Sequence, residues 1–318
     1  MHKHEILQTA RKILKVCMGV KPKETILIVS DTATSPLIGE ALFDIASSMG
    51  CEVVLAKMLP RAHSSIEPPA AIAEAMKNSD VVIAPTSKSL SHTKARMKSC
   101  CKARIATMPG ITEEMMVSGG MTADYEEVSK LVMESCSVLS SAKQIRIITE
   151  LGTDITFDVH GCIWMMDTGL CNAPGCCTNL PGGEVYVSPK NAEGELVVDS
   201  TISEIGLLAS PIKISVRKRY AYEIKGEGID KLITLLEAAG KQAYNIAELG
   251  FGMNPNARIR GNSLEDEKVK DTVHVGLGDS STIGGDVVAG IHIDAIITKP
   301  RIFVDEEEIS LESISKVK

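Results

Sequence analysis

The sequence has few aromatic residues and no long apolar segment. Its 318 residues include four Phe, five Tyr and one Trp, so aromatic platforms that stack on nucleic-acid bases are scarce. No apolar run approaches the roughly 18 residues needed to span a bilayer, and the opening segment MHKHEILQTA lacks the apolar core and cleavage site of a signal peptide. The formal net charge of −7 is unlike the basic stripe of a nucleic-acid-binding protein. We therefore expect a cytoplasmic protein that binds neither nucleic acid nor membrane.

Several motifs of common catalytic folds are also missing. The first strand candidate is followed by SDTATSP rather than by G-x-G-x-x-G, which argues against a dinucleotide site there. The chain has no G-x-x-x-x-G-K-[ST] for a P-loop, no G-x-S-x-G for a nucleophile elbow and no H-E-x-x-H for a zinc-peptidase helix. The N-terminal part therefore offers no local chemistry of its own.

Cysteine usage agrees with a reducing compartment. The nine cysteines are odd in number, follow no repeating spacing and form no C-x-x-C. A secreted disulfide framework and a structural zinc site are therefore not expected. We expect reduced thiols that are buried or partly exposed.

The chain does contain enough apolar sequence, 44% of its residues, for a large core, and its length predicts about two domains. Up to residue 143, apolar strand candidates alternate with helical patterns, which predicts a doubly wound parallel sheet with helices on both faces. The strand candidates are 24–31, 52–58, 79–86 and 103–108, and the helix candidates are 5–19, 35–50, 68–77, 112–117 and 123–142.

The pattern changes after residue 143. Short strand candidates are separated by Gly, Asn, Asp and Pro turns, and one clear helix candidate covers 229–242. This pattern is typical of a β-rich α+β domain. We therefore predict an α/β domain at 1–143 and a β-rich domain at 144–318.

The most informative segment is GIHIDAII at 290–297. Side chains of a strand alternate between its two faces, so His292 and Asp294 share one face while the isoleucines take the other. An imidazole and a carboxylate placed in this way can bind one metal or two neighbouring metals. The alternative is a buried His–Asp hydrogen-bonded pair.

Four more residues extend this set. His274 lies between two valines, Glu184 follows a Pro-Gly-Gly turn, and Glu248 lies among apolar residues and glycines. A buried carboxylate is costly unless it is paired or metal-bound, and this mixture of ligands suits Zn, Co, Mn or Fe(II). Each residue also has an ordinary interpretation, as a core histidine or a turn carboxylate. Glu267 is a further ligand or general base, or part of a solvated acidic turn.

At these residues the chain resembles the aminopeptidase T family of metallopeptidases. The matching segments are NLPGGEV at 179–185, AELGFGMNP at 247–255, HVGLG at 274–278, GG at 284–285 and HID at 292–294, in the same order. The resemblance implies a two-metal centre held by Glu184, Glu248, His274, His292 and Asp294. It also implies a homodimer and a β-rich domain that binds the metals.

The chain also resembles 2,5-dihydroxypyridine 5,6-dioxygenase, a non-haem iron enzyme. That resemblance implies one Fe(II) held by His274, His292 and Asp294, with open positions for substrate and dioxygen. Two departures from the peptidases favour it. The chain reads Asp279-Ser280-Ser281-Thr282 where the peptidases carry a Tyr, and its interval from His274 to His292 is shorter than theirs.

From the five candidate ligands we expect first a divalent-metal-dependent aminopeptidase acting on small peptides. Its metals (Zn, Co or Mn) would polarise the scissile carbonyl, and Glu184 or Glu267 would act as general base. The second hypothesis is an Fe(II) ring-cleaving dioxygenase acting on a small molecule. The third is a non-catalytic protein stabilised by metal.

Overall fold

The computed structural model describes residues 3–311 and divides them into two compact units. The first unit comprises the chain up to Ser129 together with Asp167–Gly182, and the second comprises Lys130–Met166 and the chain from Gly183 onwards. No helix among the described residues is long and apolar enough to cross a membrane.

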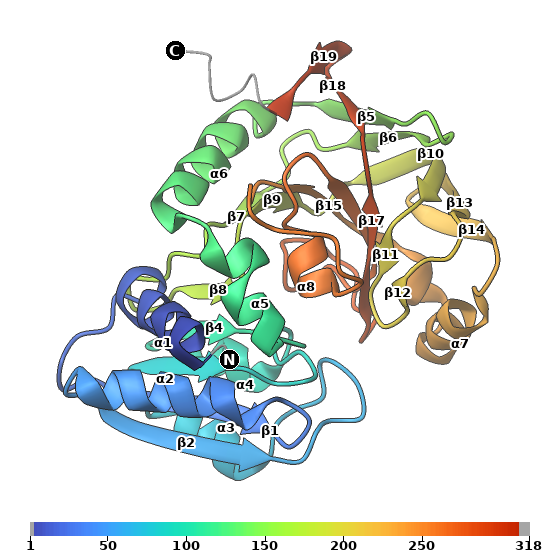
Figure 1. The fold of residues 1–318 in the computed structure, drawn as a ribbon. Helices are drawn as coiled ribbons and strands as arrows, with labels where there is room; N and C mark the ends of the chain where they lie inside the picture. The colour runs from blue at the N-terminus through green and yellow to red at the C-terminus, as the bar shows by residue number, and fades with distance from the viewer. Residues whose placement is uncertain (1–2, 312–318) are drawn as a thin grey trace. The chain divides into compact units, whose positions relative to one another are not determined.

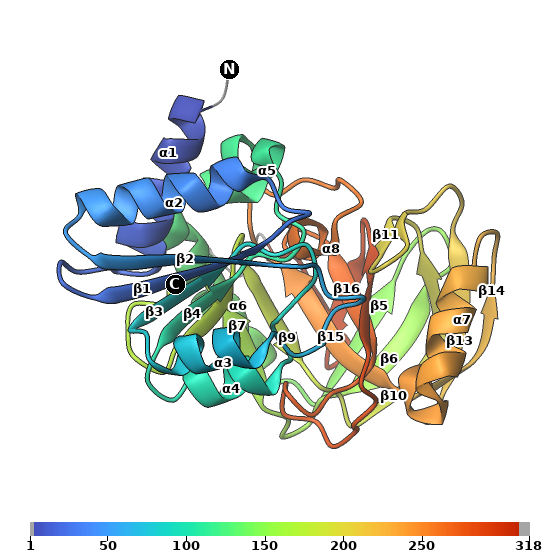
Figure 2. The same ribbon diagram turned by 90° about the horizontal axis from the view of Figure 1, so that it is seen from below.

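The first unit is built on a five-stranded parallel sheet in the order β2-β1-β3-β4-β8. The order in which strands are added reverses at β1, with β2 on one side of it and β3, β4 and β8 on the other, as in doubly wound folds. Figure 2 shows α2 on one face of the sheet and α3 and α4 on the other. The parallel sheet covered on both faces is therefore confirmed. The strands are β1 (Thr25–Asp31), β2 (Glu52–Met58), β3 (Val81–Ala84), β4 (Arg104–Thr107) and β8 (Cys177–Asn179).

Most helices of this unit lie close to their expected positions, whereas α4 was not predicted from the sequence. The first expected helix continues beyond Lys12 as a π-helical turn over Ile13–Cys17. The α-helices are α1 (Lys3–Lys12), α2 (Pro36–Ser48), α3 (Ala70–Lys77), α4 (Lys94–Ser99) and α5 (Glu113–Val117), with a 3₁₀ turn at Gly119–Thr122.

The second unit contains two seven-stranded sheets whose described pairings are antiparallel. The first has the order β14-β13-β10-β6-β5-β18-β19 and the second β12-β11-β17-β16-β15-β9-β7. Its strands are β5 (Gln144–Ile148), β6 (Asp154–Asp158), β7 (Trp164–Asp167), β9 (Glu184–Val187), β10 (Asn191–Val198), β11 (Thr201–Ile202), β12 (Gly206–Leu207), β13 (Ile212–Arg217), β14 (Tyr220–Lys225), β15 (Ile246–Gly252), β16 (Val273–Gly278), β17 (His292–Ile297), β18 (Arg301–Val304) and β19 (Glu307–Ile309).

Three α-helices accompany these sheets or lead into them. They are α6 (Tyr125–Leu139), α7 (Asp230–Ala239) and α8 (Ser263–Asp266), with a 3₁₀ turn at Lys241–Tyr244. The expected β-rich α+β character of this part is therefore confirmed.

The division of the chain differs from the single boundary expected near residue 143. The parallel sheet takes its last strand, β8, from residues 177–179, and β8 pairs with β4 through Ile105 and Cys177 (Figure 1). The chain thus returns to the first unit after entering the second. A three-residue strand gives no periodic signal, which is why the sequence did not reveal this return.

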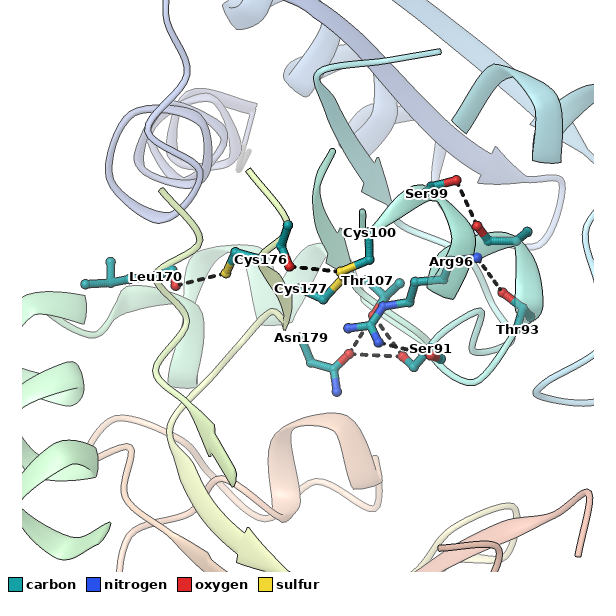
Figure 3. Close-up of a disulfide and its surroundings, with 12 residues drawn as sticks. Ser91, Thr93, Arg96, Ser99, Cys100, Thr107, Leu170, Cys176, Cys177 and Asn179 are labelled. Carbon is teal, nitrogen blue, oxygen red and sulfur yellow. Dashed lines mark hydrogen bonds between the residues drawn. A yellow bond between two sulfur atoms is a disulfide. The ribbon is translucent and has the colours of Figure 1, made fainter. Parts of the chain in front are cut away.

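The pairing of β8 with β4 also corrects the expectation of reduced thiols throughout. Cys177 in β8 forms a disulfide with Cys100 at the end of α4 (Figure 3), while the other seven cysteines are free. The two residues lie 77 positions apart in the sequence. Only the strand pairing brings them together, so their spacing could not reveal the bond.

Candidate metal centre

Four neighbouring strands carry the five candidate ligands predicted from the sequence. Glu184 begins β9, Glu248 lies in β15, His274 in β16, and His292 and Asp294 in β17. In the strand register, His274 is opposite Gly250, Glu248 and Asp294 are both opposite Gly276, and Glu184 is opposite Gly252. The antiparallel sheet therefore brings residues that are 110 positions apart in the sequence into one row.

Two glycines make room for the imidazole rings. A Cβ atom on Gly250 would lie 2.0 Å from His274 Nε2, and one on Gly276 would lie 2.8 Å from His292 Nε2 and 2.9 Å from Glu248 Cβ. Glycine weakens a strand, so Gly250 and Gly276 do not stabilise the sheet. Their role is to leave room for the two imidazole rings. The rings occupy the space beside Gly250 and Gly276 because these residues have no side chains.

Glu248 links the two histidines. Its Oε1 lies 3.2 Å from His274 Nε2 and its Oε2 lies 3.2 Å from His292 Nε2. His292 Nε2 is also 3.0 Å from Asp294 Oδ1, and His274 Nε2 is 3.5 Å from Glu184 Oε2. His292 and Asp294 therefore share one face of β17, as their spacing predicted.

These atoms form two overlapping groups, each able to surround a metal ion. Glu184, Glu248 and His274 make one group, and Glu248, His292 and Asp294 make the other, with ligand atoms within 4.8 Å of one another. The side chains are 0–15% exposed. Buried carboxylates and imidazoles are the donors that Zn, Fe, Mn and Co take, so the residues fit a divalent ion. Their individual roles as ligands stay a prediction.

The neighbouring loop orients His292. Its Nδ1 lies 2.7 Å from the backbone carbonyl oxygen of Asp279 and donates to it, which directs Nε2 towards Asp294 and Glu248. The Asp279 carboxylate in turn accepts from the backbone N–H groups of Ser281, Ala289 and Gly290. Such outer contacts fix the tautomer and the direction of a metal-binding imidazole.

Lys268 is a member of the site that the sequence did not reveal. Its side chain is fully buried, and its Nζ lies 2.6 Å from Glu184 Oε1 and forms a second ion pair with Glu267. A lysine that follows three acidic residues has the pattern of a solvated surface turn. Only its burial beside Glu184 distinguishes it.

The interpretation of Glu267 as part of a solvated acidic turn is wrong. Glu267 is 12% exposed, and Glu265 and Asp266 before it are fully buried. Arg260 pairs with Glu265, and the Thr201 hydroxyl donates to Asp266. These contacts hold the turn inside the protein, where Glu267 and Lys268 join the site.

Burial and charge change the proton affinities of the site. Burial raises the pKa of the Glu267 carboxyl to about 8, against the opposing charge of Lys268. Burial alone would lower the pKa of His274, but its hydrogen bond to Glu248 and the charge of Glu184 raise it to about 9. The pKa of His292 is raised in the same way by Asp294 and Glu248. Without metal, these carboxylates therefore favour the charged imidazolium form of both histidines.

We expect metal affinity to rise with pH between 6.5 and about 8.5. A metal ion must displace the imidazole protons, so each displaced proton adds about a factor of ten per pH unit below the pKa. The same raised pKa values stabilise the metal-free fold below pH 6.5, and this contribution is lost as pH rises through about 9. Calorimetric titration in buffers of different ionisation enthalpy counts the released protons. An affinity independent of pH over this range would contradict the expectation.

Comparisons with known proteins identify a family and two solved structures that this chain is similar to. A family model described as 2,5-dihydroxypyridine 5,6-dioxygenase matches residues 5–313. The structure is similar to that of 2,5-dihydroxypyridine dioxygenase from Pseudomonas putida KT2440, with a TM-score of 0.80 and 16% identity over 97% of this chain and 96% of that one. It is also similar to wild-type AmpT from Thermus thermophilus, with a TM-score of 0.73 and 14% identity over 95% of each chain. No curated protein matches significantly.

At these identities the two solved structures show a shared fold. Both resemblances seen in the sequence are therefore matched by a similarity of fold. The family model goes further, because it covers nearly every described residue, and the chain belongs to the 2,5-dihydroxypyridine 5,6-dioxygenase family.

Proposed function

We propose that the protein is a non-haem iron dioxygenase that opens the ring of a small dihydroxylated N-heteroaromatic compound. The observation that carries this proposal is that Glu248 contacts both His274 and His292 and that His292 contacts Asp294, in a chain that belongs to the 2,5-dihydroxypyridine 5,6-dioxygenase family. Two imidazoles and one carboxylate on one side of an ion are the ligand set of Fe(II) oxygenases. The sequence alone favoured an aminopeptidase, and the family match moves the preference to its alternative.

Different residues of the site would have different roles in such a reaction. His274, His292 and Asp294 would hold iron, which supplies open positions for the substrate and dioxygen. Glu248 lies between both rings and keeps their Nε2 atoms at fixed positions. Glu267, whose pKa is raised to about 8 by burial, is suited to accept a proton from a substrate hydroxyl.

The direct test is dioxygen uptake by iron-loaded protein. Protein prepared without oxygen and loaded with one equivalent of Fe(II) should consume one dioxygen for each 2,5-dihydroxypyridine, and the absorbance of the aromatic ring should disappear. The matched control is the same preparation loaded with Zn(II). The protein should bind this ion, but the zinc-loaded protein should consume no dioxygen. Iron-loaded protein that consumes no dioxygen with any dihydroxypyridine would contradict the proposal.

The second candidate, a two-metal aminopeptidase, is favoured by one observation. The five ligands form two groups that share Glu248, the arrangement of a carboxylate between two ions. Two divalent ions would polarise a scissile carbonyl, and Glu267 would serve as general base. Two Zn, Co or Mn ions per chain with hydrolysis of amino-acid amides would support this candidate. A protein that binds metal but has neither activity would have a structural role.

A further inference from the structure

We infer that Lys268 takes the place of a second metal ion, so that the centre holds one ion despite its five candidate ligands. The inference deepens the proposed function, on which it rests, because it names the residue that sets the metal number. Its basis is that Glu184, a ligand in the two-metal arrangement, already has a buried cation as its partner.

The ammonium is in direct contact with Glu184. Lys268 Nζ lies 2.6 Å from Glu184 Oε1, and the side chains are 0% and 6% exposed. A buried ion pair at this distance is a charge-assisted hydrogen bond, and removing one partner leaves an uncompensated charge. Glu184 is therefore neutralised by the protein itself, whereas Asp294 pairs with the His292 imidazole at 3.0 Å.

The backbone holds Lys268 in this position. Its N–H donates to the Glu265 carbonyl oxygen at 3.0 Å, and its carbonyl oxygen accepts from Asn254 N at 2.8 Å. The following residue packs so closely on β15 that a Cβ on Gly252 would lie 2.0 Å from the Val269 carbonyl oxygen. Gly252 thus admits the segment against the strand that carries Glu248. These contacts fix the Lys268 backbone beside that strand.

A second divalent ion would meet this charge at close range. An ion bound between Glu184, Glu248 and His274 would lie within a few ångströms of Lys268 Nζ, since both would contact the same carboxylate. Repulsion between cations is strong at such a distance in a buried site, where water does not screen it. The ion pairs of the group Glu248, His292 and Asp294 join its carboxylates to the His274 and His292 imidazoles. The charge of Lys268 therefore disfavours an ion beside Glu184 and leaves the region of His292 and Asp294, two of the three proposed iron ligands, for the single ion.

The number of ions bound tests the inference, using the whole chain. Titration of wild-type protein with Mn(II) should saturate at one ion per chain, with the electron paramagnetic resonance signal of an isolated ion. Lys268→Met keeps the length of the side chain and removes its charge, so it should bind a second ion at least a hundredfold more tightly than wild type. Two ions should then give a spin-coupled signal. Lys268→Arg, the matched control, keeps the cation and should bind one ion.

Each result decides the point. Two ions in wild-type protein, or one ion in folded Lys268→Met, would overturn the inference. If Lys268→Met does not fold without metal, it is prepared in excess Mn(II), and the wild-type count stands as a measurement that needs no variant. The proposed function is judged separately. One ion per chain without dioxygen uptake would overturn the proposed function and leave the role of Lys268 intact. Two ions per chain with dioxygen uptake would overturn the role of Lys268 and leave the proposed function intact.

Discussion

Replacing Asp294 with alanine should remove the metal and, with it, the activity. Asp294 Oδ1 lies 3.0 Å from His292 Nε2, and both enzyme hypotheses use these two residues as ligands. Loss of a residue that only supports a ligand costs about 10–100-fold in metal affinity, so loss of a ligand should exceed that range. We expect activity to fall by at least about a thousandfold, in proportion to the lost metal.

Metal analysis and activity of the purified variant measure this effect together. The matched control is Asp154→Ala, which removes a strand carboxylate that is half exposed and paired with Arg146. An exposed ion pair contributes little, so this control should bind metal as wild type does. Full metal occupancy with undiminished activity in Asp294→Ala would reduce the His292–Asp294 contact to a structural hydrogen bond.

The second large effect should come from Gly250→Ala, although this residue has no functional group. The added methyl would lie 2.0 Å from His274 Nε2, closer than two such atoms can approach. Either the ring or β15 must move, at a cost of about 1–3 kcal/mol in folding free energy. Because the displaced atom is the candidate ligand itself, metal affinity should fall by far more than stability.

A helix glycine provides the control for this substitution. Gly39→Ala in α2 places a methyl 3.2 Å from Leu55 Cδ1, the end of a side chain that is 36% exposed and able to move. Alanine is about 1 kcal/mol more favourable than glycine inside a helix, so this variant should keep or gain stability and bind metal normally. Thermal unfolding and metal titration compare the two variants. Normal metal affinity in Gly250→Ala would show that the His274 ring is not held where the structure places it.

The first unit was predictable because its signals are local. Each strand of β1 to β4 is an apolar run with a helix beside it in sequence, and β1, β3 and β4 are buried almost throughout, as strands of a covered parallel sheet are. The strand β15 was not predicted as a strand, because Gly250 and Gly252 lower its β propensity. A side chain at either glycine would clash with another element: with His274 at Gly250, and with the backbone of Lys268 and Val269 at Gly252. The two glycines that made β15 hard to predict are therefore required by the packing of the site.

The candidate ligands were predictable because imidazoles and carboxylates stand out in apolar, glycine-rich segments. Lys268 was not, because a lysine beside Glu267 has the same sequence pattern whether it is solvated or buried. Its role depends on the distance to Glu184, 84 residues earlier, and that distance comes from the tertiary fold. The sequence thus identified the residues that could hold metal, whereas the number of ions depends on a contact that only the structure reveals.

Anomalous diffraction at the iron edge, from crystals of iron-loaded protein, tests the account most directly. We expect one peak per chain, about 2.0–2.2 Å from His292 Nε2 and from a carboxylate oxygen of Asp294, with Glu184 still paired to Lys268. Two peaks on either side of Glu248, or no peak near His292, would contradict it.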